Sequence, residues 1–285
     1  MTSFDRLSPL LERLRVQTRL FHIGPLCGVT TFGAQEGRGF LHVLRKGEME
    51  LTHQAPDGRL DTRHVDRPTL LFYPRPLEHA FHNAPTADSD FACATLDFVG
   101  GANHPLISTL PPVIVLPLDA VDTLEPALDL LFTEIDHVRC GRRILADRLF
   151  EVVLIQLFRW IVDHPDELAL SSGLAAALSD EHLAQALVAM HESPGKPWTL
   201  ATMAKAAHMS RSSYAARFKE LVGQPPAEYL AGWRVTVAQD RLRTGASVGH
   251  IAAELGYSNP PAFSRAFTRR VGHSPRAWLA LQSDP

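Results

Sequence analysis

Cysteine is scarce in this 285-residue sequence, which contains only Cys27, Cys93 and Cys140. Three cysteines so far apart cannot form a disulfide framework, and no two of them have the spacing of a zinc knuckle. The chain also lacks an apolar run of the roughly 18 residues that a membrane-spanning helix needs. These shortages argue against a disulfide-stapled or membrane-spanning protein, and they leave thiol chemistry as the role of any functional cysteine.

A secretory signal is also missing from the sequence. The first residues, MTSFDRLSPLLERLRV, contain no continuous apolar stretch and carry Asp5 and Glu12. The composition, 45% hydrophobic and 21% charged, is that of a soluble globular protein. We therefore expect a cytoplasmic protein without a membrane partner, long enough for two domains.

Acidic and basic residues are unevenly distributed along the chain. Of the 28 Lys and Arg and the 31 Asp and Glu, 12 basic and 8 acidic residues lie from Asp180 onward, a net charge of +4. The preceding part keeps 16 basic and 23 acidic residues, a net charge of −7. A basic part is typical of polyanion binding, because cations that neutralise phosphates release counterions. It is equally typical of an ordinary solvated surface.

The front of the chain has the pattern of antiparallel β structure. Between residues 20 and 118, β-rich runs such as FLHVLRKGEMEL, TLLFYPRP and FACATLDFVGG alternate with turn residues such as APDG. This spacing predicts a barrel or a sandwich.

From Asp119 the pattern becomes helical. A helix within GRRILADRLFEVVLIQLFRWIVDHP has almost no polar face, so we expect it to be buried on two sides. Either it is enclosed within its own domain or it forms the contact between two copies of the chain. The polar, small-residue stretch that follows, DELALSSGLAAALSD, predicts a linker.

The C-terminal part contains an internal repeat. MAKAAHMS at 203–210 matches IAAELGYS at 251–258 with an offset of 48 residues. Downstream the offset is 49, so the second copy carries one extra residue, which fits a turn. The later matches pair Phe218, Val222, Gly223 and Pro226 with Phe267, Val271, Gly272 and Pro275.

Each copy predicts a helix-turn-helix motif. Small residues let the second helix cross the first closely, and Ser210, or Ser258 and Asn259 in the second copy, can cap that second helix. The second helix buries aromatic residues at i and i+4 and ends at Gly223 or Gly272. Its opposite face is then free to enter a DNA major groove.

Two such motifs joined by one helix resemble the DNA-binding domain of the AraC/XylS family of transcription regulators. The resemblance covers residues 182 to 281 and includes the glycine-x-x-proline signatures GQPP and GHSP. It implies contact with double-stranded DNA and, for an activator, with RNA polymerase. Carried over by position, the residues expected to contact bases are Arg211, Ser212, Ala215 and Ala216 in the first motif and Asn259, Pro260, Ser264 and Arg265 in the second.

The arginines of these helices divide into two expected roles. Arg265 is the candidate guanine contact, because a guanidinium can donate to O6 and N7 together, with a phosphate contact as the alternative. Arg217 and Arg269 are candidate phosphate contacts, which position the protein without reading sequence. The first helix presents two alanines, so we expect it to specify sequence weakly.

A second resemblance lies in the front part of the chain. The segment PRPLEHAFHN resembles the second cupin motif, with Pro74, His79 and Asn83 in place and Pro76 where that family has glycine. It implies a cupin-like antiparallel barrel. The His-x-His and Glu metal ligands of the first cupin motif are missing, although cupin enzymes need about three protein ligands.

Two histidines nevertheless form a candidate metal or effector pocket. Strand alternation predicts that His42 and His79 face the same interior, whereas His82 points away. A metal ion held there is the one candidate cofactor. A lone buried histidine is also typical of a satisfied core residue.

The layout around the cysteines resembles the cupin-sensor subset of the AraC family, which includes regulators that respond to reactive chlorine species through cysteine oxidation. The resemblance implies that Cys27 and Cys93 are the sensing pair. A thiolate stabilised by a neighbouring cation oxidises first and then condenses with a second thiol. Cys140 has basic neighbours but no evident partner.

These observations predict an α+β protein with two domains. We expect a cupin-like sensor domain at 1–118, a helical dimerisation segment at 119–170, a linker at 171–181 and an all-α DNA-binding domain at 182–285. The expected function is that of a homodimeric transcription regulator, not an enzyme, that answers to an oxidant, a small molecule or a metal. The alternatives are a cupin metalloenzyme with a DNA-binding appendage, and an effector domain that binds a sugar or an aromatic acid without redox chemistry.

Overall fold

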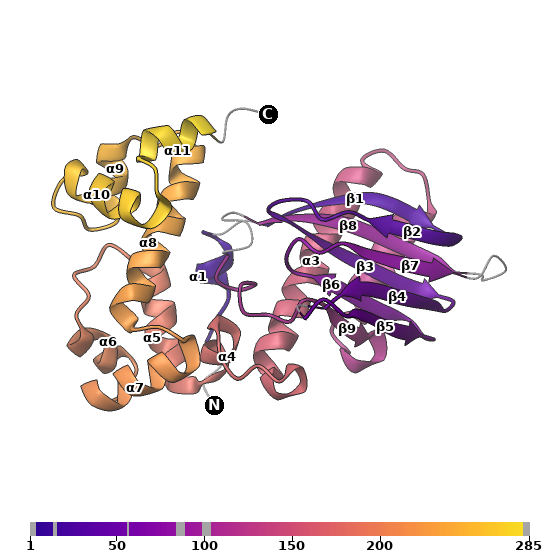
Figure 1. Cartoon of the computed structure of the whole chain (residues 1–285), viewed down its shortest axis with the longest axis horizontal. Helices are drawn as coiled ribbons and strands as arrows, with labels where there is room; N and C mark the ends of the chain where they lie inside the picture. Colours follow the sequence, from indigo (N-terminus) through magenta and orange to yellow (C-terminus); the bar gives the residue numbers. More distant parts are fainter. Residues whose placement is uncertain (1–3, 14–15, 56, 84–88, 99–103, 282–285) are drawn as a thin grey trace. The chain divides into compact units, whose positions relative to one another are not determined.

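The chain divides into two compact units in the computed structural model, which describes residues 4–13, 16–55, 57–83, 89–98 and 104–281. The sheet unit spans Val16–Ala169. The helical unit combines Met1–Arg15 with Leu170–Pro285. The first unit contains the strands of the protein together with a few helices, whereas the second is built of helices (Figure 1).

Two antiparallel sheets form the body of the sheet unit. The first sheet has the order β1 (Val16–Gly24), β8 (Asp90–Phe98), β3 (Arg38–Lys46), β6 (Thr69–Tyr73) and β9 (Ile114–Pro117). The second sheet has the order β2 (Gly28–Phe32), β7 (His79–Asn83), β4 (Met49–Gln54) and β5 (Leu60–Val65).

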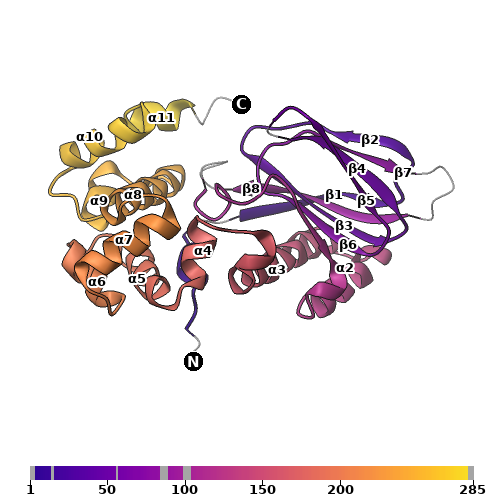
Figure 2. The same ribbon diagram turned by 60° about the horizontal axis from the view of Figure 1, so that its bottom comes forward.

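The first sheet is covered on both faces, which explains why its central strands are buried along most of their length. Helices α2 (Glu125–Asp136) and α3 (Arg142–Asp163) lie along its outer side (Figure 2). Phe72 of β6 meets Phe158 of α3 with ring centroids 6.0 Å apart. Its neighbour Tyr73 points the other way, into the core between the two sheets.

The second sheet is covered on one face, so its strands alternate. Along β4, Met49, Leu51 and His53 are buried while Glu50 and Gln54 are exposed. Within the described residues the edge strands of the two sheets do not pair with each other. The predicted α+β class is therefore confirmed, but the predicted barrel is an open, two-layered sandwich.

Helix α3 packs on two neighbours, the first sheet and α2, and keeps a further face exposed. One face packs on the first sheet through residues such as Phe150 and Leu157. On the other face Val152 is 42% and Ile155 is 37% exposed. Burial on two sides is therefore confirmed for the faces toward the sheet and α2, while the exposed face keeps the dimer contact as a prediction.

The helical unit consists of two similar halves joined by α8 (Pro226–Arg243) (Figure 1). The first half contains α4 (Leu174–Ser179), α5 (Glu181–Glu192), α6 (Leu200–Ala206) and α7 (Arg211–Val222). The second half contains α9 (Val248–Glu254), α10 (Pro260–Val271) and α11 (Pro275–Leu281). None of the helices in the described part of the chain is long and apolar enough to cross a membrane.

The division into units differs from the predicted boundaries at two places. Residues 171–181 are not an extended linker, because α4 buries Leu174, Leu178 and the alanines between them. Small side chains allow this close packing. Linkers are also rich in small residues, which is why the sequence predicts a linker here. In addition, α1 (Ser8–Leu11) contacts α5 and so belongs to the helical unit.

Candidate functional site

The first helix-turn-helix motif is formed by α6 and α7. The hydroxyl of Ser210 accepts a hydrogen bond from Ser213 N at 3.2 Å and caps α7, as predicted. Tyr214 and Phe218 are fully buried with ring centroids 5.5 Å apart, which anchors one face of the helix. Gly223, at φ 85°, ends the helix in the left-handed conformation.

The opposite face of α7 carries the residues predicted to contact bases. Arg211, Ser212 and Ala216 are exposed, and Ala215 is half-buried. Two alanines and one serine offer little hydrogen-bonding capacity, so most of the polar reach of this face comes from Arg211.

The second motif, formed by α9 and α10, repeats this construction with different residues. The side-chain oxygen of Asn259 accepts a hydrogen bond from Ala262 N at 2.8 Å and caps α10. Phe263 and Phe267 are fully buried. Pro260 and Arg265 are exposed and Ser264 is half-buried. The Asn259 oxygen caps the helix and its amide nitrogen lies 3.4 Å from Ser258 Oγ, so both polar groups of this side chain already have a local partner.

Three of the four predicted DNA-contacting arginines are free to bind an anion. No described residue forms an ion pair or hydrogen bond with the side chain of Arg211, Arg265 or Arg269. Arg217 differs from this prediction, because its Nε lies 3.1 Å from Asp180 and its Nη1 3.3 Å from Glu220. Its guanidinium holds the residue that caps α5, a role that its sequence position does not reveal.

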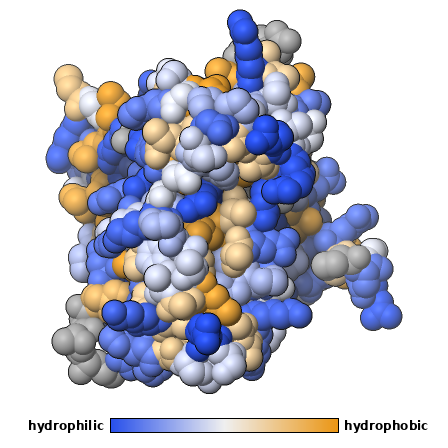
Figure 3. Space-filling view, turned by 90° about the vertical axis from the view of Figure 1, so that its left-hand side faces the viewer, coloured by the Kyte–Doolittle hydropathy of each residue, from blue (hydrophilic) through white to orange (hydrophobic). Residues whose placement is uncertain are grey.

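The exposed surface around these helices is mainly hydrophilic. Figure 3 views the side of the protein that carries α6 and α10, and shows polar and charged residues with smaller hydrophobic areas between them. Such a surface suits a polar, highly charged and hydrated ligand such as DNA.

The sheet unit contains a second group of predicted site residues in its core. His42 of β3 and His79 of β7 come from different sheets and meet between them, with their Nε2 atoms 3.0 Å apart. Both rings are buried. Tyr73 stacks on His79 with ring centroids 3.7 Å apart. His82 lies on the opposite face of β7, as predicted, with its Nε2 2.9 Å from Thr52 Oγ1.

Burial determines the protonation of this histidine pair. It lowers the pKa of His42 well below its usual value and that of His79 to about 4, so both rings are neutral near pH 7. His79 Nδ1 donates to Leu77 O at 2.9 Å, because a carbonyl oxygen can only accept. His42 Nε2 then donates to His79 Nε2. His42 Nδ1 is left as a buried acceptor without a hydrogen-bond partner among the described residues.

A third inward-facing histidine was missed by the sequence argument. His53 of β4 lies opposite His79 in the strand register and its side chain is 3% exposed. Its Nε2 is 3.5 Å from Asp61 Oδ2 on β5. The alternation of Met49, Leu51 and His53 in MELTHQ is the signal that predicts its inward direction.

The two predicted sensing cysteines lie in contrasting surroundings. Both thiols are free, with Cys27 exposed and Cys93 fully buried. Cys93 lies opposite His42 on the neighbouring strand. Burial raises the pKa of Cys93, so its thiol is protonated and lacks the thiolate character required of the cysteine that oxidises first.

The histidine pair does not fit a cupin metal centre. Among the described residues, no group of three or more His, Cys, Asp or Glu side chains lies close enough to hold a metal ion. Two neutral imidazoles fall short of the roughly three protein ligands of such a centre.

Comparison with known proteins identifies both units. A cupin family model matches residues 5–163, more than half of the chain, and a helix-turn-helix domain model matches residues 203–280. A protein named as an AraC-like transcription regulator, from Streptomyces lividans, is 36% identical over 177 residues. The chain belongs to the AraC family of DNA-binding transcription regulators. This AraC-family chain covers 58% of the length of that relative, and 61% of its own residues are matched.

Two further proteins are similar to this AraC-family chain. The RCS-specific transcriptional activator RclR of Escherichia coli K12 is 26% identical over 239 residues, which cover 82% of this chain and 81% of RclR. The crystal structure of the DNA-binding domain of AdpA with a target DNA is 33% identical, covers 36% of this chain and 93% of that chain, and has a TM-score of 0.34. The relatives named here are regulators, which points to a regulator rather than an enzyme.

Proposed function

We propose that this AraC-family protein binds specific sequences of double-stranded DNA with both helix-turn-helix motifs and activates transcription through RNA polymerase when the sheet unit receives a signal. The pair of recognition helices carries the proposal. Helices α7 and α10 are each capped by a side chain and buried along one face, and each keeps an unpaired arginine on the other. Such helices enter the major groove as rigid units.

The proposed contacts fall into base readout and phosphate binding. Arg265 donates to a guanine, Arg211 contributes most of the polar contacts of α7, and Arg269 binds phosphate. Arg217 is left out because it is paired with acidic residues. The remaining base contacts are proposed for Ser212, Ala215, Ala216, Asn259, Pro260 and Ser264.

Selection from a randomised duplex library tests this function. The full chain is expected to enrich sequences with two conserved blocks about one helical turn apart, because one protein molecule presents two recognition helices. Footprinting on a selected duplex then shows two protected major-groove segments. Equal affinity for selected and scrambled duplexes at fixed salt would contradict the proposal.

We also propose that the protein is a homodimer formed through the exposed face of α3. Leu145, Val152 and Ile155 lie on that face and are 43%, 42% and 37% exposed. Their spacing of seven and then three residues follows the a and d positions of a helix pair, which suits a second copy of the same helix. Sedimentation of the Val152→Lys variant is expected to show monomers where the unchanged protein shows dimers. A dimer that survives this charge would place the interface elsewhere.

The proposed signal is an oxidant that reaches the cysteines of the sheet unit. Hypochlorous acid would transfer its OH to the sulfur of Cys27, which is oxidised by two electrons, while chloride leaves and the thiol proton is released. Condensation of this sulfenic acid with the Cys93 thiol would form a disulfide and release water. Because Cys93 is buried and protonated, the second step requires local opening of the sandwich. That opening would disturb the adjacent His42–His79 pair.

A DNA-binding titration on reduced and oxidised protein tests the signal. Modification of Cys27 is expected first, followed by the Cys27–Cys93 link and a change in DNA affinity or footprint. The Cys140→Ser variant is the matched control, since Cys140 is also exposed. If DNA binding ignores the oxidant, the core around His42 and His79 becomes the site to probe with organic effectors.

A further inference from the structure

The N-terminal residues form a structural part of the helical unit, here called the clasp (residues 4–13). Asp5 accepts hydrogen bonds from the backbone nitrogens of Leu7 and Ser8 at 3.1 and 2.9 Å, just before and at the start of the short helix α1. Leu7 and Leu10 are buried. Arg6 donates to the carbonyl oxygen of Leu178 in α4 at 3.1 Å. Apolar and polar contacts together hold the clasp against the first half.

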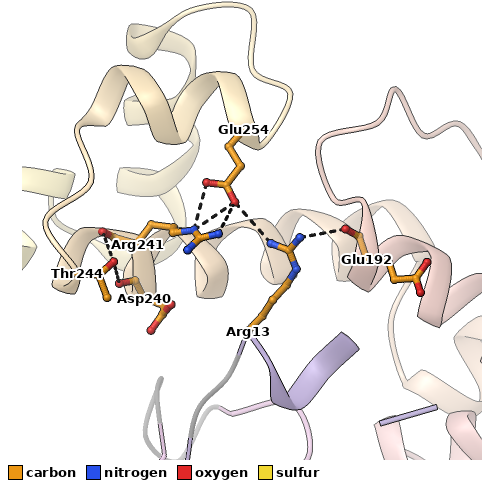
Figure 4. A network of polar contacts seen from close by, with 6 residues as sticks. All are labelled: Arg13, Glu192, Asp240, Arg241, Thr244 and Glu254. Carbon is orange, nitrogen blue, oxygen red and sulfur yellow. Dashed lines mark hydrogen bonds and ion pairs between the residues drawn. The ribbon is translucent and has the colours of Figure 1, made fainter. Parts of the chain in front are cut away.

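Arg13, at the end of the clasp, contacts both halves of the helical unit (Figure 4). Its Nη2 donates to the carbonyl oxygen of Glu192 at 3.0 Å, and its Nη1 lies 3.6 Å from Glu254 Oε1. Glu192 is the last residue of α5 in the first half, and Glu254 is the last residue of α9 in the second. One guanidinium therefore bridges the two halves of the helical unit.

The chemistry of both contacts favours a cation at this point. The last carbonyl groups of a helix have no intrahelical partner and carry the negative end of the helix dipole. Glu254 adds a carboxylate to the C-terminal end of α9, where a negative charge is unfavourable unless it is paired. Arg241 of α8 supplies one partner, with its Nη2 2.9 Å from Glu254 Oε1, and Arg13 supplies the other.

The junction that Arg13 bridges is also the place where the halves touch through their backbones. Gly195, in the loop after α5, lies so close to Gly256 of the second motif that a Cβ on either residue would overlap the other chain segment. Arg234 of α8 donates to the carbonyl oxygen of Pro194 in the same loop at 2.8 Å. The relative angle of α7 and α10 thus depends on a small set of contacts around α8.

We propose that Arg13 is a positioning residue for DNA recognition: it fixes the angle between the two recognition helices and thereby the spacing of the DNA segments that they read. The inference rests on the proposed function and deepens it. Two helices that enter successive major-groove segments about 34 Å apart tolerate little error in their relative placement. Because this contact holds both halves in the folded protein, the entropy cost of aligning them does not reduce the affinity for DNA.

Base-pair insertion between the two DNA blocks tests the proposal on the full chain. The probe is the duplex selected by the unchanged protein, together with versions in which one base pair is added or removed between the blocks. The Arg13→Ala variant is expected to bind the selected duplex roughly three- to tenfold more weakly, the range for losing one partly exposed charge-assisted contact. Its additional loss on the altered duplexes is expected to be smaller than that of the unchanged protein, because the freed halves can readjust.

Matched variants separate positioning from general damage. Glu12→Ala changes the exposed neighbouring residue and is expected to keep the affinity and the spacing penalty of the unchanged protein. Glu254→Gln removes the carboxylate partner and is expected to relax the spacing in the same direction as Arg13→Ala. Arg13→Lys keeps the charge but not the two-armed geometry, so it should fall between Arg13→Ala and the unchanged protein.

The outcomes distinguish this inference from the function on which it rests. A merely structural role of Arg13 would lower the folded fraction and weaken binding to all duplexes by the same factor, leaving the spacing penalty unchanged. That result, with normal binding by the unchanged protein, would overturn the inference. If the unchanged protein does not discriminate between selected and scrambled duplexes, the proposed function itself fails.

Discussion

The two helix-turn-helix motifs share the backbone of their turns but not the residue at its tightest point. That residue is His208 at φ 54° in the first motif and Gly256 at φ 75° in the second. The hydrogen bond that closes the turn is 2.9 Å long in both, from Met209 N to Ala204 O and from Tyr257 N to Ala252 O. The left-handed conformation is easy for glycine and costs free energy for histidine.

The neighbours of each turn explain the difference. The side chain of His208 is exposed. A Cβ at Gly256 would overlap the carbonyl oxygen of Gly195 and lie 2.9 Å from its carbonyl carbon. At His208 the only cost is the strain of the left-handed backbone. At Gly256 a side chain would also clash with Gly195. A repeated sequence preserves local hydrogen bonds, while contacts with the rest of the unit decide which residue each copy can carry.

Substitution of Gly256 by alanine is the strongest way to break this comparison. The new methyl group clashes with backbone and occupies a left-handed conformation, so we expect the free energy of unfolding of the helical unit to fall by roughly 2–4 kcal/mol. Urea unfolding of the full chain, followed by circular dichroism at 222 nm, measures the change.

The His208→Gly variant is the matched control for the other motif. It relieves the left-handed strain and leaves the hydrogen bonds in place, so the free energy of unfolding should rise by up to about 1 kcal/mol. The loss of unfolding free energy in Gly256→Ala should exceed the gain in His208→Gly. If Gly256→Ala changes the unfolding free energy as little as a surface substitution does, the contact between Gly195 and Gly256 does not hold the two halves together.

The recognition helices provide the second test of the comparison. Arg265→Ala in the second motif is expected to weaken specific DNA binding by about 1–3 kcal/mol and to leave non-specific binding nearly unchanged, because a bidentate guanine contact is lost. Ala216→Gly in the first motif is the control and should alter specific binding less. The measurement is a pair of titrations, on selected and scrambled duplexes at one salt concentration. Equal losses on both duplexes would make Arg265 a phosphate contact.

Features that repeat or alternate locally could be predicted from the sequence. The two motifs, their caps at Ser210 and Asn259 and their glycine ends follow from short-range spacing, which fixes helix starts and stops. The inward direction of His42 and His79 follows from strand alternation in the same way. The packing of one sheet on the other then brings the two rings together.

Features that depend on distant partners could not be predicted in this way. Arg217 looks like a phosphate contact until the fold brings Asp180 to it, 37 residues away in the sequence. The clasp lies beside α5 although 179 residues separate Arg13 from Glu192. The buried state of Cys93 depends on both sheets, so its thiol pKa could not be inferred from charged neighbours in the sequence.

Acidification distinguishes the cores of the two halves of the helical unit. His191 is fully buried in the first half, with its Nε2 2.6 Å from Tyr229 Oη, and burial lowers its pKa to about 3. The unfolded chain binds a proton at this residue below a pKa of about 6.5, while the folded chain stays neutral. Stability from this group is therefore complete above that pH and is lost as the pH falls. In the described part of the second half, the buried motif residues are aromatic or aliphatic.

The His191→Gln variant isolates this effect. Between pH 7.5 and 5.5 the unchanged protein is expected to lose about 1.4 kcal/mol more unfolding free energy than the variant, since glutamine keeps hydrogen-bonding capacity without titrating. Urea unfolding at the two pH values gives the difference. An identical pH dependence in both proteins would mean that His191 is not held neutral by the fold.

The arginines Arg217 of α7 and Arg269 of α10 give the test with the smallest expected effect. Arg269 of α10 has no ion-pair partner among the described residues, whereas Arg217 of α7 is paired with Asp180 and Glu220. Each phosphate contact contributes about 0.9 to the slope of log affinity against log salt concentration. Arg269→Ala should therefore reduce that slope by about 0.9, the share of one phosphate contact, while Arg217→Ala should leave it unchanged. A reduced slope for Arg217→Ala would mean that DNA phosphate replaces Asp180 and Glu220 as the partner of Arg217. Both motifs would then contact the DNA backbone through an arginine of the recognition helix.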